Sequence, residues 1–385
     1  MRRSTDKILT THVGALPGDP EIWTGQAPEA RVAEAVKDVV RFQRDAGVDI
    51  VNEGELTKGG NWVTFVNDRL TGFEPRQTGV MGSLLTQSQD WVEFDQFYAA
   101  AMREGVLFED TGAAPSQTRV SDWVCTGPIE YRGQAALERE IALLKAALGD
   151  VPPSDAFLTS TAPASIEAGR VNEHYASEEA YVFALADALS VEYETIARAG
   201  LNVQVDDAWL AALWDRIGVG MGLEGYRRYC ALRIEALNHA LRNVPEAQVR
   251  YHMCWGSWHG PHAHDIPLPD MVELLLSIKA QTYLIEAANV RHEHEAAVWE
   301  RVKLPEGKIL APGVVSHSTK LIEHPELVSA RIQRFARMVG RENVIASTDC
   351  GLGLRCHPQI AWAKLKALSE GAALASRALG YAKAA

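Results

Sequence analysis

The sequence of 385 residues predicts an α/β protein, a (β/α)8 or TIM barrel that forms one domain over residues 1–385. Two observations lead to this fold class. Eight short β-like runs alternate with long amphipathic helical stretches, as in a parallel sheet with crossover helices. In addition, no low-complexity tract and no Pro/Ser-rich linker separates two domains. Eight β/α units are the number that closes this barrel, whereas a doubly wound open sheet is the structural alternative.

The β-like runs are short segments, each preceding or following a helical stretch. They are residues 8–14, 48–55, 156–163, 201–207, 249–254, 282–288, 308–315 and 343–351. Residues 28–47 and 177–200 are two of the helical stretches, and each ends in Ala-Gly directly before a run. A glycine in this place closes a helix at its C-terminus, so each Ala-Gly pair predicts a helix end followed by a strand.

One segment does not fit the alternation. Residues 60–155 separate the second run from the third, include DWVCTGPIEYRG, and are too long for a simple crossover. We expect an insertion of one or two helices and a β-hairpin near the mouth of the barrel, where it would cover the active site.

Composition limits the class of protein. The formal net charge of -12 opposes a nucleic-acid partner or an anionic membrane surface, because both attract basic patches. No run approaches the roughly 20 apolar residues that a transmembrane helix needs. The N-terminus lacks the apolar segment of a secretory signal, and five cysteines do not form a disulfide framework. We therefore expect a cytoplasmic protein in which a cysteine near a histidine indicates metal binding or catalysis.

Polar side chains gather at the predicted strand ends. In a barrel, the C-terminal ends of the strands form one open face that carries the functional residues. At or just after the ends of the runs stand His12, Glu55, Asp206, Asp207, His252, Cys254, Glu286, His317, Asp349 and Cys350. Buried strand ends without a task would carry apolar or small residues, so this face is the predicted active site.

The sharpest pattern is HMC, residues 252–254. Positions i and i+2 of a strand point to the same side, so His252 and Cys254 can bind one metal ion. Cys350 would supply a second sulfur and Glu286 an oxygen, and this set suits tetrahedral zinc. The alternative is a buried cysteine beside a hydrogen-bonded histidine. Nearby substitutes for a misassigned ligand are Cys356 and His357.

The motifs TTHVGALP, VNEGE, QVDD, HMC, LIEAAN and STDCGLG resemble, in order, those of the C-terminal barrel of cobalamin-independent methionine synthases and their relatives, including epoxyalkane:coenzyme M transferases. The resemblance implies a barrel of the uroporphyrinogen decarboxylase and methionine synthase superfamily. It also implies a catalytic zinc ion held by His252, Cys254, Glu286 and Cys350.

The same resemblance implies roles for other residues. His317, in PGVVSHST, matches the proton-donating histidine of the family, and a histidine titrates near working pH. Glu55 and Asp206 match carboxylates that bind the amino group of homocysteine, and His12 and Asp207 are expected to join them at the substrate. Two departures leave the acceptor open: Ala15 replaces a usual serine, and Asp207 replaces a usual glutamate whose following proline is absent.

The predicted function is therefore a zinc-dependent alkyl transfer to a thiol. Free thiols titrate near 8.5, and zinc binding ionises them while they remain nucleophilic. The expected partners are a small-molecule thiol and an alkyl donor, either methyl-folate, a methylcorrinoid or an epoxide, and a homo-oligomer is left open. Methyl transfer of the methionine synthase type is the first hypothesis. Thiol addition to an epoxide, as with coenzyme M, and a metal-free decarboxylase are the alternatives.

Other clusters have simpler interpretations. HEHE, residues 292–295, is expected to be a solvated first helical turn, where acids favour the helix dipole. Of the three histidines in residues 259–264, two are expected to have structural roles in a loop. Trp62, Trp255 and Trp258 would form either a stacking wall for a flat donor or ordinary packing.

Overall fold

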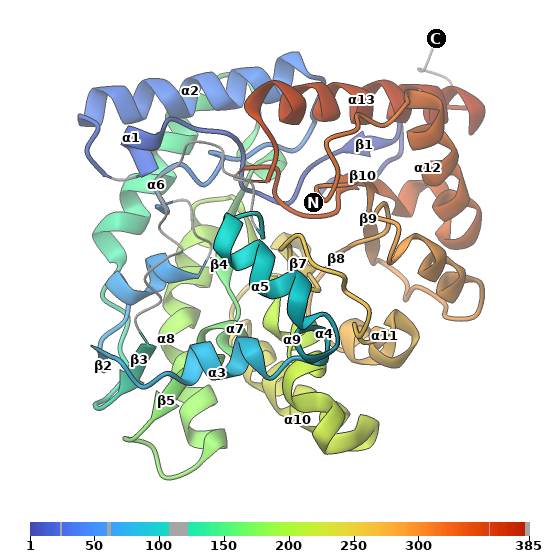
Figure 1. Ribbon diagram of the computed structural model, residues 1–385. Helices are drawn as coiled ribbons and strands as arrows, with labels where there is room; N and C mark the ends of the chain where they lie inside the picture. Colours follow the sequence, from blue (N-terminus) through green and yellow to red (C-terminus); the bar gives the residue numbers. More distant parts are fainter. Residues whose placement is uncertain (24, 60–62, 108–121, 354, 382–385) are drawn as a thin grey trace.

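The computed structural model describes residues 1–23, 25–59, 63–107, 122–353 and 355–381. Its centre is a curled sheet of seven strands in the order β1-β10-β9-β8-β7-β6-β4, and all neighbours that pair are parallel (Figure 1). The strands are β1 Leu9–Thr10, β4 Phe157–Thr161, β6 Asn202–Asp207, β7 Val249–Met253, β8 Thr282–Ile285, β9 Ile309–Val315 and β10 Ile345–Thr348. Each lies inside one of the predicted runs, so the alternation predicted these elements correctly.

The second predicted run, residues 48–55, differs from the others. Ile50 donates its N–H to the carbonyl of Thr10 in β1 at 3.1 Å. Val51 forms an isolated parallel bridge with Ala156, directly before β4. This segment therefore lies between the two ends of the sheet order, but it forms a single bridge instead of the expected strand.

Pairing stops at Val51 because Asn52 donates its N–H to the side chain of Gln43 and the backbone turns soon afterwards. Gly54 and Glu55 both adopt the left-handed region, with φ of 72° and 58°. This conformation is strained for a residue with a side chain and it breaks the extended pairing that a strand requires. The turn places the Glu55 side chain against the backbone of Gly14, which leaves no room there for a Cβ atom.

Apolar side chains inside the sheet show that it is curled. One buried cluster joins side chains from both ends of the strand order and from the strands between them. Its members are Leu9, Val13, Ile50, Phe157, Leu284, Ile309, Ala311 and Ile345. In a flat sheet of seven strands, Leu9 of β1 and Phe157 of β4 would lie at opposite edges and would not share a cluster.

Helices pack against the outer face of the sheet, and the larger apolar core lies between the two layers. The α-helices of the described chain outside residues 63–107 are α1 Pro20–Trp23, α2 Glu29–Asp45, α6 Gln134–Ala147, α7 Pro163–Glu167, α8 Glu178–Arg198, α9 Trp209–Ala212, α10 Val219–Ala240, α11 Leu268–Leu276, α12 Pro325–Val339 and α13 Pro358–Ala378. The short 3-10 helices are η1 Thr64–Asp68, η2 Pro153–Asp155, η4 Glu246–Gln248, η5 Glu293–Glu300 and η6 Arg341–Asn343, and η3 Trp214–Gly218 is a π-helix. Helices α2 and α8 end before Gly47 and Gly200, whose positive φ values match the predicted glycine caps.

The segment between Val51 and β4 contributes two strands of a small second sheet and three further helices. Strand β2 Phe73–Arg76 pairs antiparallel with β3 Asp122–Cys125, and β5 Arg170–Asn172 extends this sheet in parallel with β3. Helices α3 Val80–Thr86, α4 Gln89–Glu93 and α5 Asp95–Glu104 follow β2. We call residues 88–107 the cap segment, because hydrogen bonds join it to the loop after β7. His259 N donates to Leu107 O, and Trp258 Nε1 donates to the Tyr98 hydroxyl.

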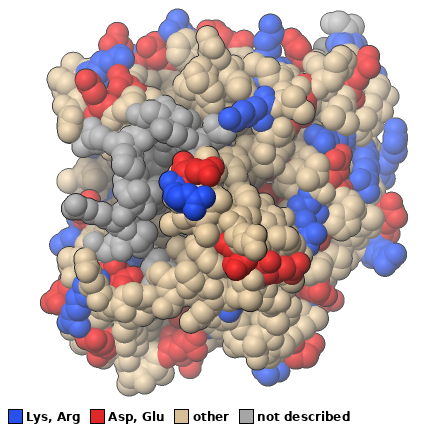
Figure 2. All heavy atoms as spheres, in the orientation of Figure 1, with Lys and Arg blue, Asp and Glu red and all other residues tan. Residues whose placement is uncertain are grey.

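The described surface carries charges of both signs. On the face shown in Figure 2, acidic and basic side chains are interspersed between neutral ones. Among the described residues, no helix has both the length and the apolar character that are needed to cross a membrane.

Candidate metal centre

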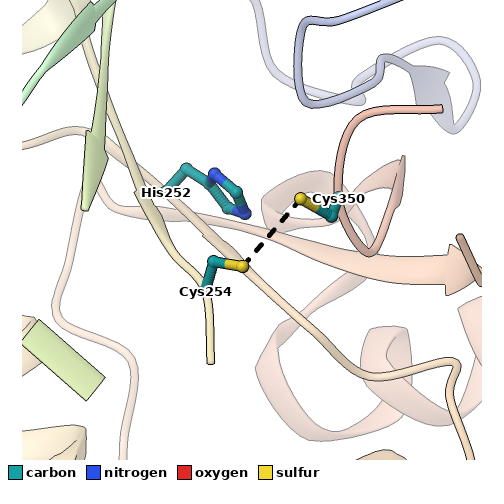
Figure 3. Close-up of side chains that lie close together, drawn as sticks. All are labelled: His252, Cys254 and Cys350. Atoms are coloured by element: carbon teal, nitrogen blue, oxygen red, sulfur yellow. Dashed lines mark hydrogen bonds between the residues drawn. The ribbon is translucent and has the colours of Figure 1, made fainter. Parts of the chain in front are cut away.

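Two cysteines and a histidine converge at the C-terminal ends of β7 and β10. The possible ligand atoms of His252, Cys254 and Cys350 all lie within 4.8 Å of one another. The two sulfur atoms are 3.9 Å apart, and the imidazole ring of His252 points toward the space between them (Figure 3). His252 and Cys254 are buried and Cys350 is partly exposed. We call these three residues the sulfur cluster. The structure thus brings together three of the four predicted ligands.

A carboxylate orients the histidine of the sulfur cluster. Asp206 Oδ1 lies 3.0 Å from His252 Nδ1 and also accepts a hydrogen bond from Gln204 Nε2 at 2.9 Å. His252 Nε2 is buried and has no hydrogen-bond partner among the described residues. Burial disfavours the charged ring, but the hydrogen bond to Asp206 outweighs it and raises the pKa of His252 to about 9. A carboxylate on one ring nitrogen with the other nitrogen left over is the usual arrangement of a metal-binding histidine.

The two thiols differ in acidity. The contact with Cys254 lowers the pKa of Cys350 to about 6, although burial opposes this effect. The same contact, together with burial, raises the pKa of Cys254. The Cys254 sulfur also accepts the Gly256 N–H at 3.2 Å. One thiolate is therefore available near neutral pH, and thiolate is the form that binds a metal ion.

The fourth predicted ligand, Glu286, follows β8 and belongs to a second group. Its possible ligand atom lies within 4.8 Å of those of His317 and Asp349, and all three residues are buried. Glu286 Oε1 accepts the Trp255 N–H at 2.9 Å and Oε2 accepts the Asn289 amide at 2.7 Å. Burial is the main cause that raises the pKa of Glu286 to about 7. We call Glu286, His317 and Asp349 the carboxylate cluster.

The predicted proton donor, His317, follows β9. Burial and the charge of Arg355 hold the pKa of His317 well below its usual value, so the ring is neutral. Its Nδ1 atom is buried and has no hydrogen-bond partner among the described residues. Cys356 donates its S–H to the His317 carbonyl at 3.7 Å, and the exposed His357 caps α13. Cys356 and His357 were considered as substitutes for a misassigned zinc ligand. Within the described residues, neither belongs to a group of possible ligands.

Two acidic residues, Glu55 and Asp206, lie beside the sulfur cluster, and we call them the acidic pair. Glu55 is buried, and burial is the main cause that raises its pKa to about 8. The Lys58 ammonium opposes this shift and the charge of Asp206 adds to it. Two carboxylates that influence each other in this way are suited to bind a positively charged group of a substrate.

Lys58 provides a positive charge near the acidic pair. Its ammonium donates to the carbonyl and the hydroxyl of Thr159 at 2.5 and 2.6 Å. Glu53 Oε1 lies 3.9 Å from Lys58 Nζ, and neither oxygen of Glu53 has a hydrogen-bond partner among the described residues. Burial raises the pKa of Glu53, and Lys58 is the nearest counterion that opposes the shift. The sequence reasoning singled out neither Lys58 nor Glu53, although both flank Glu55.

The other two residues expected at the substrate have structural partners. Asp207 accepts hydrogen bonds from Ser165 at 2.7 Å and from Tyr251 at 3.0 Å, one on each oxygen. His12 Nε2 lies 2.8 Å from the side-chain oxygen of Gln43, and burial lowers the pKa of His12 to about 3. The structure places neither side chain in the two clusters of possible ligands.

The histidines that follow β7 organise the loop and the cap segment. His262 lies 3.0 Å from an oxygen of Asp265, and His264 lies 2.6 Å from an oxygen of Glu93 in α4. Trp258 stacks on His262, with ring centroids 4.2 Å apart. The first and third of these contacts lie within the loop after Cys254, and the bond between His264 and Glu93 joins that loop to the cap segment.

The expectation of a solvated turn at residues 292–295 is wrong for its first and last residues. His292 and Glu295 are buried, and His292 lies 3.1 Å from Asp265 Oδ2 and 2.9 Å from Glu295 Oε2. The local pattern gave no sign of Asp265, which lies 27 positions earlier in the chain. The tryptophans considered for a stacking wall include Trp255 and Trp62. Trp255 is buried and donates its indole N–H to the Ile266 carbonyl, and Trp62 lies outside the described residues.

Known proteins share this fold and align with most of this chain at low sequence identity. The solved structure of a B12-independent methionine synthase from Shewanella, in complex with selenomethionine, has a TM-score of 0.71 and 18% identity, and covers 97% of this chain and 99% of that one. A putative vitamin-B12 independent methionine synthase from Listeria monocytogenes has a TM-score of 0.63 and 17% identity, with 95% and 98% covered. At these identities the likeness establishes the fold.

Two curated relatives align over most of the chain. The 2-hydroxypropyl-CoM lyase of Xanthobacter autotrophicus is 23% identical, covering 94% of this chain and 91% of the relative. A methionine synthase of Saccharolobus solfataricus is 25% identical, with 88% and 82% covered. A family model described as the catalytic domain of the cobalamin-independent synthases matches residues 156–373, which is more than half of the chain and includes every residue of both clusters. The chain therefore belongs to the family of the cobalamin-independent synthase catalytic domain.

Proposed function

We propose that the protein is a zinc-dependent alkyltransferase that acts on a small thiol. The observation that carries the proposal is the sulfur cluster, in which three possible ligand atoms lie within 4.8 Å of one another. The buried, unpartnered Nε2 of His252 is a position that a metal ion would fill. One imidazole and two sulfurs are a donor set that suits zinc, and a carboxylate oxygen of Glu286 is the proposed fourth ligand.

The relatives support the same chemistry at the level of the family, since they are named methionine synthase and 2-hydroxypropyl-CoM lyase. When bound, zinc supplies a Lewis acid that keeps a substrate thiol ionised near neutral pH while the sulfur remains nucleophilic. In the proposed reaction the sulfur forms a bond to the alkyl carbon. The bond from that carbon to its leaving atom breaks, and the leaving atom takes up a proton.

We propose that His317 delivers this proton. Its Nδ1 atom is free to carry it, and the carboxylates of Glu286 and Asp349 lie close enough to stabilise the imidazolium while it is charged. Because burial and the charge of Arg355 keep the ring neutral at the start, His317 takes up the proton that the substrate thiol loses and gives it up once the leaving atom has become basic.

The acidic pair favours a thiol that also carries an ammonium group. Glu55 and Asp206 are the proposed partners of that group, and homocysteine is the first candidate acceptor. Coenzyme M carries a sulfonate in place of an ammonium group and would find no cationic partner in this pair. The alignment of a 2-hydroxypropyl-CoM lyase over 94% of the chain nevertheless keeps thiol addition to an epoxide as the second candidate. The proposed donors are methyl-folate, a methylcorrinoid or, for the second candidate, an epoxide.

The remaining sequence expectations also enter as proposals. We propose that residues 49–51 close the curled sheet into an eight-stranded barrel, since Ile50 and Val51 bond to both ends of the strand order. The whole chain would then be one domain, and the cap segment, which belongs to the insertion expected over residues 60–155, would cover the site. We further propose a cytoplasmic location, as the free cysteines suggest.

A thiol panel tests the proposed function. Homocysteine, coenzyme M and glutathione are each combined with methyl-folate, methylcobalamin and an epoxide, and zinc is measured on the purified protein. We expect about one zinc ion per chain and turnover with homocysteine and a methyl donor. Cys350→Ala should lose metal and turnover together, whereas Cys230→Ala removes a buried cysteine outside the sulfur cluster and should keep both. Full activity in the presence of a chelator, with little zinc bound, would refute the proposal.

A further inference from the structure

We propose that Asn289 is a positioning residue that holds Glu286 in the orientation of a metal ligand. This inference rests on the proposed function, in which Glu286 completes the ligand set of the sulfur cluster. It assigns a role to Asn289, the last residue of the LIEAAN motif, for which the sequence predicted none.

The amide of Asn289 is fixed on both sides. Its Oδ1 accepts the backbone N–H groups of Arg291 and His292, each at 3.0 Å. A carbonyl oxygen can accept these bonds and an NH2 group cannot, so the amide orientation is determined by its surroundings. Nδ2 must therefore face the opposite side, where it donates to Glu286 Oε2 at 2.7 Å and to Asp349 Oδ2 at 3.2 Å.

Glu286 links the Asn289 amide to the end of β7, the strand that precedes Cys254. Its other oxygen, Oε1, accepts the backbone N–H of Trp255 at 2.9 Å, and Trp255 directly follows Cys254. Glu286 thus has one hydrogen bond on each oxygen, and both donors come from ordered, buried residues. The carboxylate plane is fixed, and the remaining lone pairs keep a defined direction.

Asp349 links the same amide to the end of β10, the strand that precedes Cys350. Its Oδ1 accepts the N–H groups of Ala287 and Ala288 at 2.7 and 2.8 Å, and Asp349 directly precedes Cys350. The ends of β7, β8 and β10 therefore share one hydrogen-bond network, and Asn289 is the member that bonds to both of its carboxylates. A displaced Asn289 would disturb Glu286 directly and the two cysteines indirectly.

Charge explains why an amide suits this position. Glu286 and Asp349 are buried, their possible ligand atoms lie within 4.8 Å of each other, and like charges at such a distance repel. An NH2 group shared by both carboxylates reduces that repulsion without adding a net charge. If it is removed, Glu286 Oε2 loses its partner and the carboxylate can rotate away from its position. Loss of such a supporting partner typically weakens metal affinity about 10- to 100-fold.

The experiment measures metal binding and the geometry of the site, not turnover alone. Zinc affinity is determined by competition with a chromophoric chelator, and the visible spectrum of the cobalt(II)-loaded protein reports the coordination geometry. Asn289→Ala should bind zinc about 10- to 100-fold more weakly and shift the cobalt bands. Asn289→Ser keeps an oxygen that can accept the N–H bonds of the turn, lacks the NH2 donor and adds no third buried acid, and it should shift the cobalt bands as well. This second variant takes the place of Asn289→Ala in the experiment if the alanine variant does not fold.

Asn172→Ala is the matched control. Asn172 forms the same kind of turn, with Oδ1 accepting the N–H groups of His174 and Tyr175 and Nδ2 donating to a carbonyl, but it lies in β5 and outside both clusters. This variant should leave zinc affinity and the cobalt spectrum unchanged. In a Glu286→Ala background, Asn289→Ala should have little further effect, because its proposed role acts through Glu286.

The two proposals fail in different ways. If the wild-type protein shows no sulfur-to-cobalt charge-transfer band, the proposed metal centre itself is wrong. If the wild type shows the band, but zinc affinity and the cobalt spectrum are the same in both Asn289 variants as in the wild type, the positioning role is wrong and the metal centre stands. The positioning role is also overturned if Asn289→Ala lowers zinc affinity as much in the Glu286→Ala background as it does in the wild type.

Discussion

Replacing Lys58 with methionine tests the charge balance around Glu53 and Glu55. The ammonium donates two hydrogen bonds to Thr159 and is the nearest cation to Glu53, and all three side chains are buried. Methionine keeps most of the volume but removes the charge and both donors. Breaking a buried charge pair on one side typically costs about 3–5 kcal/mol, because the other charge remains without compensation. We therefore expect Lys58→Met to lower the free energy of unfolding by about 3 kcal/mol at pH 7.

The pKa shifts of Glu53 and Glu55 determine whether the stability deficit of Lys58→Met grows or shrinks as the pH rises. Burial already raises the pKa of Glu53, and it raises that of Glu55 to about 8. Without Lys58 both values rise further, because the ammonium opposes both shifts. A carboxyl group with a raised pKa in the folded state favours folding when it is protonated and opposes folding when it is ionised. The deficit of Lys58→Met should thus be largest above pH 8 and should shrink as the pH falls toward 5.

Urea unfolding at a series of pH values measures this effect, with Lys364→Met as the matched control. Lys364 is also buried, and it donates to a carbonyl and to Glu323, but Glu323 has a second bond to the Ser316 N–H. In the Lys58→Met background, Glu53→Gln should recover about 1–2 kcal/mol by removing an unpaired buried acid. The charge argument would be refuted by a deficit that does not change with pH and is not reduced by Glu53→Gln.

Three further predictions concern the surroundings of the site. Asp206→Asn should weaken zinc binding about 10- to 100-fold, measured by chelator competition, because His252 loses the carboxylate that orients it. Tyr98→Phe removes the acceptor of the Trp258 indole N–H, and hydrogen exchange in α5 should accelerate by about one order of magnitude. Burial disfavours the charged ring of His292, but hydrogen bonds to Asp265 and Glu295 outweigh it and raise its pKa to about 10 from the ordinary 6.5. Its stabilisation is complete below pH 6.5 and is lost as the pH rises toward 10, so the advantage of the wild type over His292→Gln in urea unfolding should fall across this range. An advantage that is constant with pH would contradict the last prediction.

Local sequence patterns predicted most of the sheet. Strand runs and glycine-capped helices depend on periodicity and on residues a few positions apart, and seven of the eight predicted runs contain a strand of the central sheet. The exception, residues 48–55, is rich in apolar residues at its start but turns at Gly54 and Glu55. A left-handed glutamate is not visible in the sequence, because tertiary contacts impose it against the preference of the residue.

The candidate site was predictable where the ligand types themselves are distinctive. His252, Cys254 and Cys350 combine residue types that are rare at strand ends, and the structure brings them together. The supporting residues carry no such signal. Lys58 bonds to Thr159, which lies 101 positions later, and Asn289 bonds to Asp349, 60 positions later. Pairs of this kind depend on the folded geometry, and ordinary polar residues near strand ends do not indicate which partner they will find.

The order of the strands explains how the sulfur cluster and its supports act as one unit. Strands β7 and β10, which precede the two cysteines, are separated in the sheet by β8 and β9, so backbone pairing alone does not join their ends. Curling of the sheet brings the ends close, and the side chains of Glu286 and Asp349 then bond to the backbone at the end of a strand other than their own. A ligand set drawn from strands that are not neighbours gains rigidity only through such cross-bonds. It follows that variants of the supporting carboxylates and of Asn289 should change metal affinity more than they change global stability, whereas variants of apolar core residues should do the reverse.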